Sequence, residues 1–167
     1  MMWLSLWMAT WVVASAPSES SCRVHVEGLP QTQRRHHRVR VGTASQPLDP
    51  DPRVAPEDEV VLEGPRFGGR IVVPSSCAAV VPMPVTPRPA LLAFAELPPG
   101  AVITCEACPG IPSSTNYRPM RLPPIAMTGM HEVIRLRIRA RGYESVVREF
   151  LIHPGLNALS VPMKQRR

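Results

Sequence analysis

Apolar and charged residues alternate strictly over residues 134–141. The even positions are Ile134, Leu136, Ile138 and Ala140, and the odd positions are Arg135, Arg137, Arg139 and Arg141. A period of two places successive side chains on opposite faces, as in a strand with one buried and one exposed face. Gly142 and Tyr143 interrupt the pattern, and residues 146–152 form a second β-prone run. The two runs together predict a β-hairpin.

Short apolar runs on both sides of this hairpin predict further strands. We expect them at residues 22–26, 38–41, 59–62, 70–73, 77–81, 90–97, 101–105 and 157–163. Residues 117–122 contain Pro119, which suits an edge strand because proline donates no backbone hydrogen bond. The 21 prolines of the chain leave little uninterrupted sequence for helices. We therefore predict an all-β protein, in which a small antiparallel β-sandwich follows a second short β-rich region.

Proline-rich segments divide the chain. Residues 47–56 carry four prolines and predict an exposed loop, whereas Pro82, Pro84, Pro87 and Pro89 mark a linker. The predicted organisation is a signal peptide at 1–16, a β-rich N-terminal region at 22–81, the linker at 82–89 and the sandwich at 90–164. The N-terminal region either forms a domain of its own or adds strands to the sandwich.

The N-terminal segment predicts export. Residues 3–13 are an uncharged apolar run, and Ala14-Ser15-Ala16 follows it. This is the pattern of a secretory signal peptide, with cleavage between residues 16 and 21. The run is shorter than the roughly 20 residues that a membrane-spanning helix needs, so we expect no span after cleavage. The expected location is the periplasm, the outer surface or the medium; the alternative is an uncleaved N-terminus that acts as a weak anchor.

The four cysteines predict two disulfides. Exported proteins form disulfides readily, and the expected pairs are Cys22 with Cys77 and Cys105 with Cys108. The C-x-x-C spacing of Cys105 and Cys108 also fits thiol–disulfide exchange, or a zinc site completed by His131 and His153. The sequence lacks a second C-x-x-C, an H-x-x-x-H type pair and a βαβ pattern, which those activities usually require. We expect no metal and no cofactor.

Motifs for catalysis and for nucleic-acid binding are missing from the sequence. It contains no G-x-S-x-G, no H-E-x-x-H and no G-x-x-x-x-G-K-[ST], so we expect no enzymatic activity. The net charge of +6 arises from 19 basic residues, of which only Lys164 is lysine. Basic residues are not interleaved with aromatic ones as in nucleic-acid-binding modules, so no nucleic-acid partner is expected.

Two basic features remain as candidate binding sites. Residues 33–38 form the densest basic cluster, which predicts either a patch for acidic glycans or lipid headgroups or a solvated loop. On a strand, the adjacent His36 and His37 would point to opposite faces. The row of arginines from Arg135 to Arg141 would span roughly 20 Å on a strand. Such a row can hold an acidic polysaccharide, a lipopolysaccharide phosphate or an acidic partner. Alternatively it is an ordinary solvent face, partly paired with Glu144 and Glu149.

Several motifs give the C-terminal half a family resemblance. They are Pro98-Pro99-Gly100-Ala101-Val102, a middle segment with Pro119 and Pro124, Gly129-x-His131-x-Val133, the pair Gly142-Tyr143, and closing strands around Gly155. With them, residues 90–164 resemble a PEGA domain, although Pro98 stands at the acidic position of the family's signature. The resemblance implies a compact immunoglobulin- or transthyretin-like β-sandwich of an exported bacterial protein, without activity of its own.

The motif residues have physical reasons to be structural. Gly100 and Gly142 lie at strand junctions, where a positive φ suits glycine. Tyr143 can bury its ring while its hydroxyl reaches a backbone partner, and His131 is expected to make a local hydrogen bond. The predicted function is a non-catalytic structural or interaction module of the bacterial cell envelope, which contacts a surface polysaccharide or a protein partner. The alternatives are an acidic-glycan or lipopolysaccharide binder, and a metal- or redox-active protein.

Overall fold

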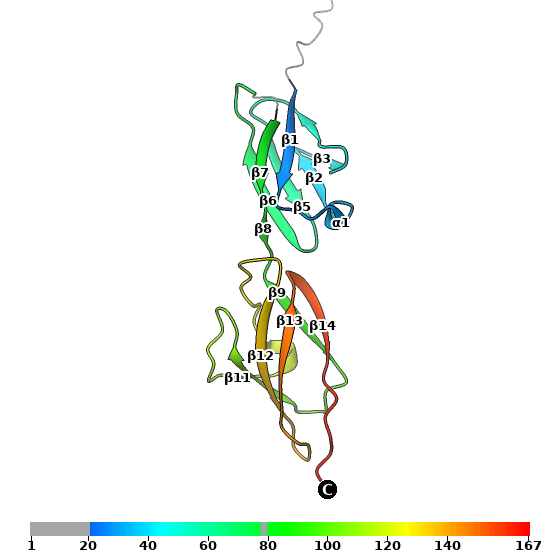
Figure 1. The fold of residues 1–167 in the computed structure, drawn as a ribbon, viewed down its shortest axis with the longest axis vertical. Helices are drawn as coiled ribbons and strands as arrows, with labels where there is room; N and C mark the ends of the chain where they lie inside the picture. Colours follow the sequence, from blue (N-terminus) through cyan, green and yellow to red (C-terminus); the bar gives the residue numbers. More distant parts are fainter. Residues whose placement is uncertain (1–20, 78–79) are drawn as a thin grey trace, which may run out of the picture.

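The chain is an all-β protein. A computed structural model describes residues 21–77 and 80–167, and in Figure 1 these residues form two modules that lie end to end. We call residues 22–87 the N-terminal module and residues 90–165 the C-terminal module. Each has a hydrophobic core of its own, one drawn from residues 22–85 and the other from residues 90–163. Within the described residues no helix is long and apolar enough to cross a membrane.

The N-terminal module contains two sheets and one helical turn. Its elements are β1 (Cys22–Glu27), α1 (Gln31–Arg34), β2 (Arg38–Val41), β3 (Ala44–Pro47), β4 (Arg53–Val54), β5 (Glu59–Glu63), β6 (Phe67–Val72), β7 (Val80–Pro84) and β8 (Thr86–Pro87). The strand orders are β4-β1-β7 and β3-β2-β5-β6-β8. Alternate residues of β1, namely Cys22, Val24 and Val26, are buried in the core between the sheets. Period-two alternation thus places β1 with one face inward.

The C-terminal module is a sandwich of a four-stranded and a two-stranded sheet. Its elements are β9 (Ala90–Ala95), β10 (Val102–Ala107), β11 (Asn116–Tyr117), the 3₁₀ turn η1 (Pro119–Arg121), β12 (Glu132–Arg139), β13 (Val146–Ile152) and β14 (Gly155–Ser160). The orders are β11-β10-β12-β13 and β14-β9. Ile134, Leu136 and Ile138 of β12 are fully buried between these sheets. The predicted hairpin is β12 and β13, which pair in antiparallel register.

Several elements differ from the sequence-based expectation. Residues 47–56 are not simply a loop, because they include the end of β3 and the strand β4. The segment 117–122 is a strand only at its start and continues as η1, although β11 does lie at the sheet edge. Two strand pairs, β1–β7 and β9–β14, are parallel and not antiparallel. Strands distant in sequence form these pairs, which a local pattern does not reveal.

The proline-rich segment expected as a linker belongs largely to the N-terminal module. Residues 80–84 form β7, which pairs with β1, and Met83 is fully buried. Thr86 and Pro87 pair with the start of β6. Pro82 and Pro84 are exposed and alternate with buried residues, so they fit a strand whose inward positions are apolar. All described ladders between named strands join strands of the same module.

Candidate functional site

The predicted row of arginines lies on the outer face of β12. Arg135 and Arg139 are exposed and Arg137 is half-buried, while the apolar residues between them point into the core. Arg141 does not extend the row, because β12 ends at Arg139 and residue 141 lies in the following turn. We call the outer surface of β10, β12 and β13 that carries Arg135, Arg137 and Arg139 the arginine face.

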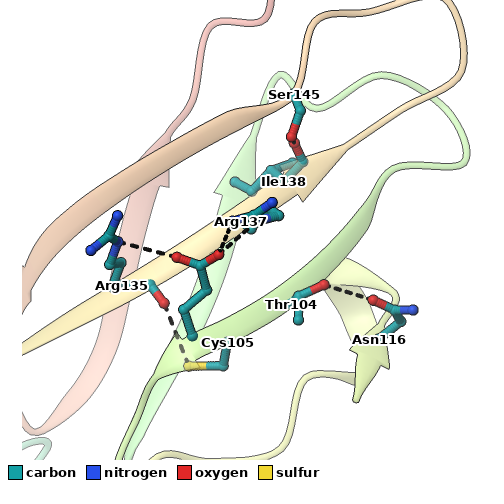
Figure 2. A network of polar contacts seen from close by, with 8 residues as sticks. Thr104, Cys105, Asn116, Arg135, Arg137, Ile138 and Ser145 are labelled. Atoms are coloured by element: carbon teal, nitrogen blue, oxygen red, sulfur yellow. Dashed lines mark hydrogen bonds and ion pairs between the residues drawn. The ribbon is translucent and has the colours of Figure 1, made fainter. Parts of the chain in front are cut away.

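One carboxylate organises two of these arginines. Arg135 and Arg137, both labelled in Figure 2, each form an ion pair with Glu106. Arg135 Nε lies 3.1 Å from Glu106 Oε2, and Arg137 Nε donates to Glu106 Oε1 over 2.6 Å. The β10–β12 register shifts between Cys105 and Ala107, so Glu106 is the extra residue of a β-bulge. Bulges re-aim a side chain, and this one sets a carboxylate between two guanidinium groups.

The acidic partners expected from the sequence are different ones. Glu149 stands directly opposite Arg135 on β13, yet among the described residues neither Glu149 nor Glu144 forms an ion pair. A separate hydrogen bond lies at the opposite edge of β10, where Thr104 Oγ1 donates to Asn116 Oδ1 of β11 over 2.6 Å (Figure 2). Glu106 therefore neutralises part of the arginine face, and the basic character that the sequence suggests is reduced.

Exposed apolar residues continue the arginine face. Val133 and Leu151 are directly opposite each other on β12 and β13, and they are 59% and 57% exposed. Val147, opposite Arg137, is also exposed. Sequence reasoning missed this feature, although Val133 follows the same odd-position pattern as the arginines. A second exposed pair, Leu91 and Leu156, lies on the β9–β14 sheet.

The four cysteines form the two expected pairs. Cys22 is bonded to Cys77 and Cys105 to Cys108, with Cα–Cα distances of 5.6 and 5.8 Å. Both distances lie within the usual range for disulfides. Cys105 is fully buried, and its Sγ lies 3.9 Å from the Arg135 carbonyl oxygen. In residues 21–77 and 80–167, no three His, Cys, Asp or Glu side chains gather in a way that could hold a metal ion.

The motif residues of the C-terminal module lie at turns and strand ends. Gly100 and Gly142 have φ values of 74° and 79°, the left-handed conformation expected of them. Tyr143 is half-buried, and its hydroxyl accepts a hydrogen bond from the Gln165 side chain, 3.3 Å away, and not from the backbone as expected. The His131 ring is exposed and makes no hydrogen bond within the described residues. Instead, His153 Nδ1 lies 3.3 Å from the carbonyl oxygen of Met130.

The basic cluster at residues 33–38 is split by the fold. Its first residues complete α1, His36 is exposed, and His37 is only 1% exposed. His37 Nδ1 donates to the Gln33 carbonyl oxygen over 2.8 Å, and Nε2 accepts from the Phe67 N–H over 3.3 Å. Burial lowers the pKa of His37. The hydrogen bond with the Gln33 carbonyl acts to raise the pKa, and the nearby charges of His36 and Arg88 act to lower it. His37 is therefore a neutral core residue and adds no charge to a surface patch.

Comparisons of the chain with protein-family models, with curated proteins and with solved structures each returned no significant match. The resemblance to PEGA domains therefore stays a prediction. The predicted signal peptide lies outside the described residues.

Proposed function

We propose that this chain is an exported, non-catalytic interaction module of the bacterial cell envelope. Its C-terminal module would contact a protein partner or a surface polymer through the arginine face. Two features of the sequence support export: the apolar N-terminal run that is followed by Ala14-Ser15-Ala16, and the four cysteines. The PEGA-like motifs of residues 90–164 support a module of this kind.

The observation that carries the proposal is the composition of the arginine face. The exposed pair Val133 and Leu151 lies on the same face as the arginines held by Glu106. Burying apolar surface contributes about 25 cal/mol per Å², and interface centres are enriched in apolar and arginine side chains. Arg135 and Arg137 are already held by a carboxylate, so less side-chain freedom would be lost on binding.

Photo-crosslinking tests this proposal at single positions. A photoreactive phenylalanine derivative placed at Val147 or at Leu151 should give an adduct of the same mass in the cell-envelope fraction. The control position is Val72, which is 66% exposed and lies on the N-terminal module. Leu151→Asp should abolish the adduct formed from Val147. An exported, folded protein that gives no adduct from either position would contradict the proposal.

A second candidate function is binding of an acidic glycan or lipopolysaccharide through the basic residues from Arg135 to Arg141. One observation near Arg141, at the end of this series of arginines, favours this second function. The segment after β14 folds back onto the β12–β13 turn, where the N–H of Arg166 donates to the Gly142 carbonyl oxygen over 2.9 Å. The N–H of Glu144 donates to the Lys164 carbonyl oxygen over 2.9 Å. Lys164 and Arg166 thus join Arg141 at the tip of the module.

Retention on a polygalacturonate resin tests this second function. Carboxylate polymers bind guanidinium groups in a salt-dependent way, so the protein should elute at a defined salt concentration. The double variant Arg141→Gln/Arg166→Gln should elute at clearly lower salt. Arg118→Gln/Arg121→Gln, which removes the same charge elsewhere in the module, is the matched control. Equal shifts in both double variants would indicate a mere net-charge effect and reject the site.

A further inference from the structure

One cleft of the N-terminal module is lined by charged residues of both signs. Its volume is about 670 Å³, and its walls come from β1, α1 and residues 46–53. The charged and titratable residues that line it are Arg23, His25, Arg34, Asp49, Asp51 and Arg53. A cleft of this size accommodates a small polar ligand.

Two arginines face each other in this cleft. Arg23 on β1 pairs directly with Arg53 on β4, and both are exposed. The N–H of Val24 donates to the Pro52 carbonyl oxygen over 3.0 Å, so residues 24 and 52 form a hydrogen-bonded pair. Hydrogen-bonded and non-hydrogen-bonded pairs alternate along an antiparallel ladder. Arg23 and Arg53 therefore occupy the non-hydrogen-bonded type of pair, in which side chains lie closest.

Neither arginine of this pair forms an ion pair in the part of the chain that the structure describes. No carboxylate oxygen of those residues lies within ion-pair distance of Arg23 or Arg53. Like charges directly opposite each other destabilise a sheet. The arrangement therefore carries an electrostatic cost that a bound anion would remove.

One of the two carboxylates that line the cleft, Asp51, is already committed to other groups. Asp51 accepts a hydrogen bond from Arg34, and its Oδ2 lies 2.9 Å from His25 Nδ1. Arg34 also donates to the Leu48 carbonyl oxygen over 2.9 Å, and its side chain is only 11% exposed. These contacts fix one wall of the cleft. The other side is held by β1, where Cys22 is bonded to Cys77.

We propose that the cleft binds a phosphate group through Arg23 and Arg53. Guanidinium groups pair bidentately with phosphate oxygens. A phosphate dianion can compensate both arginines, whereas a single carboxylate compensates one. The cleft is larger than a phosphate ion needs, and its remaining polar walls suit a phosphorylated small molecule such as a sugar phosphate. This site lies in the N-terminal module and does not depend on the function proposed for the arginine face.

Calorimetric titration and thermal unfolding of the full mature chain test the site with three probes: inorganic phosphate, glucose 1-phosphate and vesicles containing phosphatidic acid. We expect saturable binding and a higher melting temperature with at least one probe. Arg23→Gln and Arg53→Gln should each weaken binding about tenfold or more, because one of two charge-assisted contacts is lost. Arg148→Gln, which removes the same charge from the C-terminal module, should bind as the natural chain does.

The same variants give a second readout without ligand. Each substitution at Arg23 or Arg53 relieves the repulsion between the two arginines, so the ligand-free melting temperature should stay equal or rise.

The three probes separate the sources of the phosphate. Equal affinity for inorganic phosphate and glucose 1-phosphate supports a free ion, and tighter binding of glucose 1-phosphate supports a sugar phosphate. Binding to the vesicles supports a lipid headgroup. Failure of all three to bind, or unchanged binding by both arginine variants, would overturn the proposal.

Discussion

Gly155 in β14 lies against Pro65 of the N-terminal module. A Cβ atom at residue 155 would come within 2.5 Å of the Pro65 carbonyl oxygen, and the φ of Gly155 is 84°. The Gly155 N–H also donates to the Pro89 carbonyl oxygen, 3.3 Å away, just before β9. The end of the C-terminal module therefore touches the loop between β5 and β6, and only glycine fits at this contact.

Gly155→Ala should destabilise the protein clearly. A left-handed conformation costs an alanine about 1–2 kcal/mol, and the close backbone oxygen of Pro65 has no flexible side chain that could give way. We expect a loss of unfolding free energy of about 2–4 kcal/mol. Urea unfolding followed by circular dichroism measures it.

Substitutions at two other glycines separate the cost of the left-handed backbone conformation from the cost of the close contact with Pro65. Gly142 has a φ of 79° but open space around its Cβ position, so Gly142→Ala carries the conformational cost alone. Gly129 has open space and no positive φ, so Gly129→Ala should be close to neutral or slightly stabilising. If Gly155→Ala cost no more than Gly142→Ala, the contact with Pro65 would have no energetic weight.

His37 makes the stability of the N-terminal module depend on pH. Its pKa is lowered by burial, so the folded state favours the neutral ring. The stabilisation is present above the ordinary pKa of 6.5 and is lost as the pH falls from there towards the lowered pKa. Below about pH 6.5 the slope should approach at most about 1.4 kcal/mol per pH unit, the value for one proton.

Urea unfolding of two histidine variants between about pH 8 and pH 5 checks this assignment. His37→Gln removes the titration and should flatten the pH profile, at the expense of stability near neutral pH. His36→Gln changes an exposed neighbour and should keep most of the pH dependence, because burial is the main cause of the lowered pKa of His37. A natural chain whose profile matches that of His37→Gln would exclude His37 as the titrating group.

Local patterns predicted most of the strands. The alternation of Ile134, Leu136 and Ile138 with arginines locates β12 and its buried face, because a period of two depends only on backbone geometry. The short runs around β1, β2, β5, β9, β10 and β13 were located for the same reason. The disulfide between Cys22 and Cys77 belonged to the preferred one of three possible pairings, in which it ties the first strand to the end of the same region.

Features that depend on distant residues were not predictable. Prolines suggested a linker at residues 82–89, whereas Val81 and Met83 alternate with them and fill the core of the N-terminal module. Glu106 reaches Arg135 and Arg137 through a bulge that leaves no local signature. Arg23 and Arg53 are 30 positions apart in the sequence and meet only because β4 pairs with β1.

Asp51 should be the stabilising carboxylate of the cleft. Burial acts to raise its pKa, but the hydrogen bonds with His25 and Arg34 outweigh burial and place the pKa below the ordinary 3.8. Its contribution is therefore fully present above about pH 3.8 and is lost as the pH falls below that value. Asp51→Asn should cost about 1–3 kcal/mol near neutral pH, because Arg34 loses a charged partner.

Asp49→Asn is the matched control for Asp51→Asn. Asp49 lines the same cleft, is exposed and makes no side-chain hydrogen bond within the described residues. Asp49→Asn removes the same charge as Asp51→Asn and should change the unfolding free energy by less than about 0.5 kcal/mol. Equal effects of the two substitutions would mean that general charge, and not the contact of Asp51 with Arg34, determines stability here.

Glu106→Gln should make the arginine face more basic with little effect on folding. Arg135 is 54% exposed and Arg137 is 38% exposed at the side chain, so the loss of their ion pairs should cost at most about 1 kcal/mol. Both guanidinium groups then become available to an external anion. We expect stronger retention on a polygalacturonate resin, with elution at a higher salt concentration.

Glu149→Gln distinguishes freed arginines from a change in net charge. It removes one negative charge from the same face, directly opposite Arg135, but Glu149 forms no ion pair within the described residues. Net charge rises equally in the two variants. If Glu106 restrains the arginines, Glu106→Gln should shift elution further than Glu149→Gln does. Equal shifts would show that the ion pairs of Glu106 have no influence on anion binding, since only the summed charge of the face would then matter.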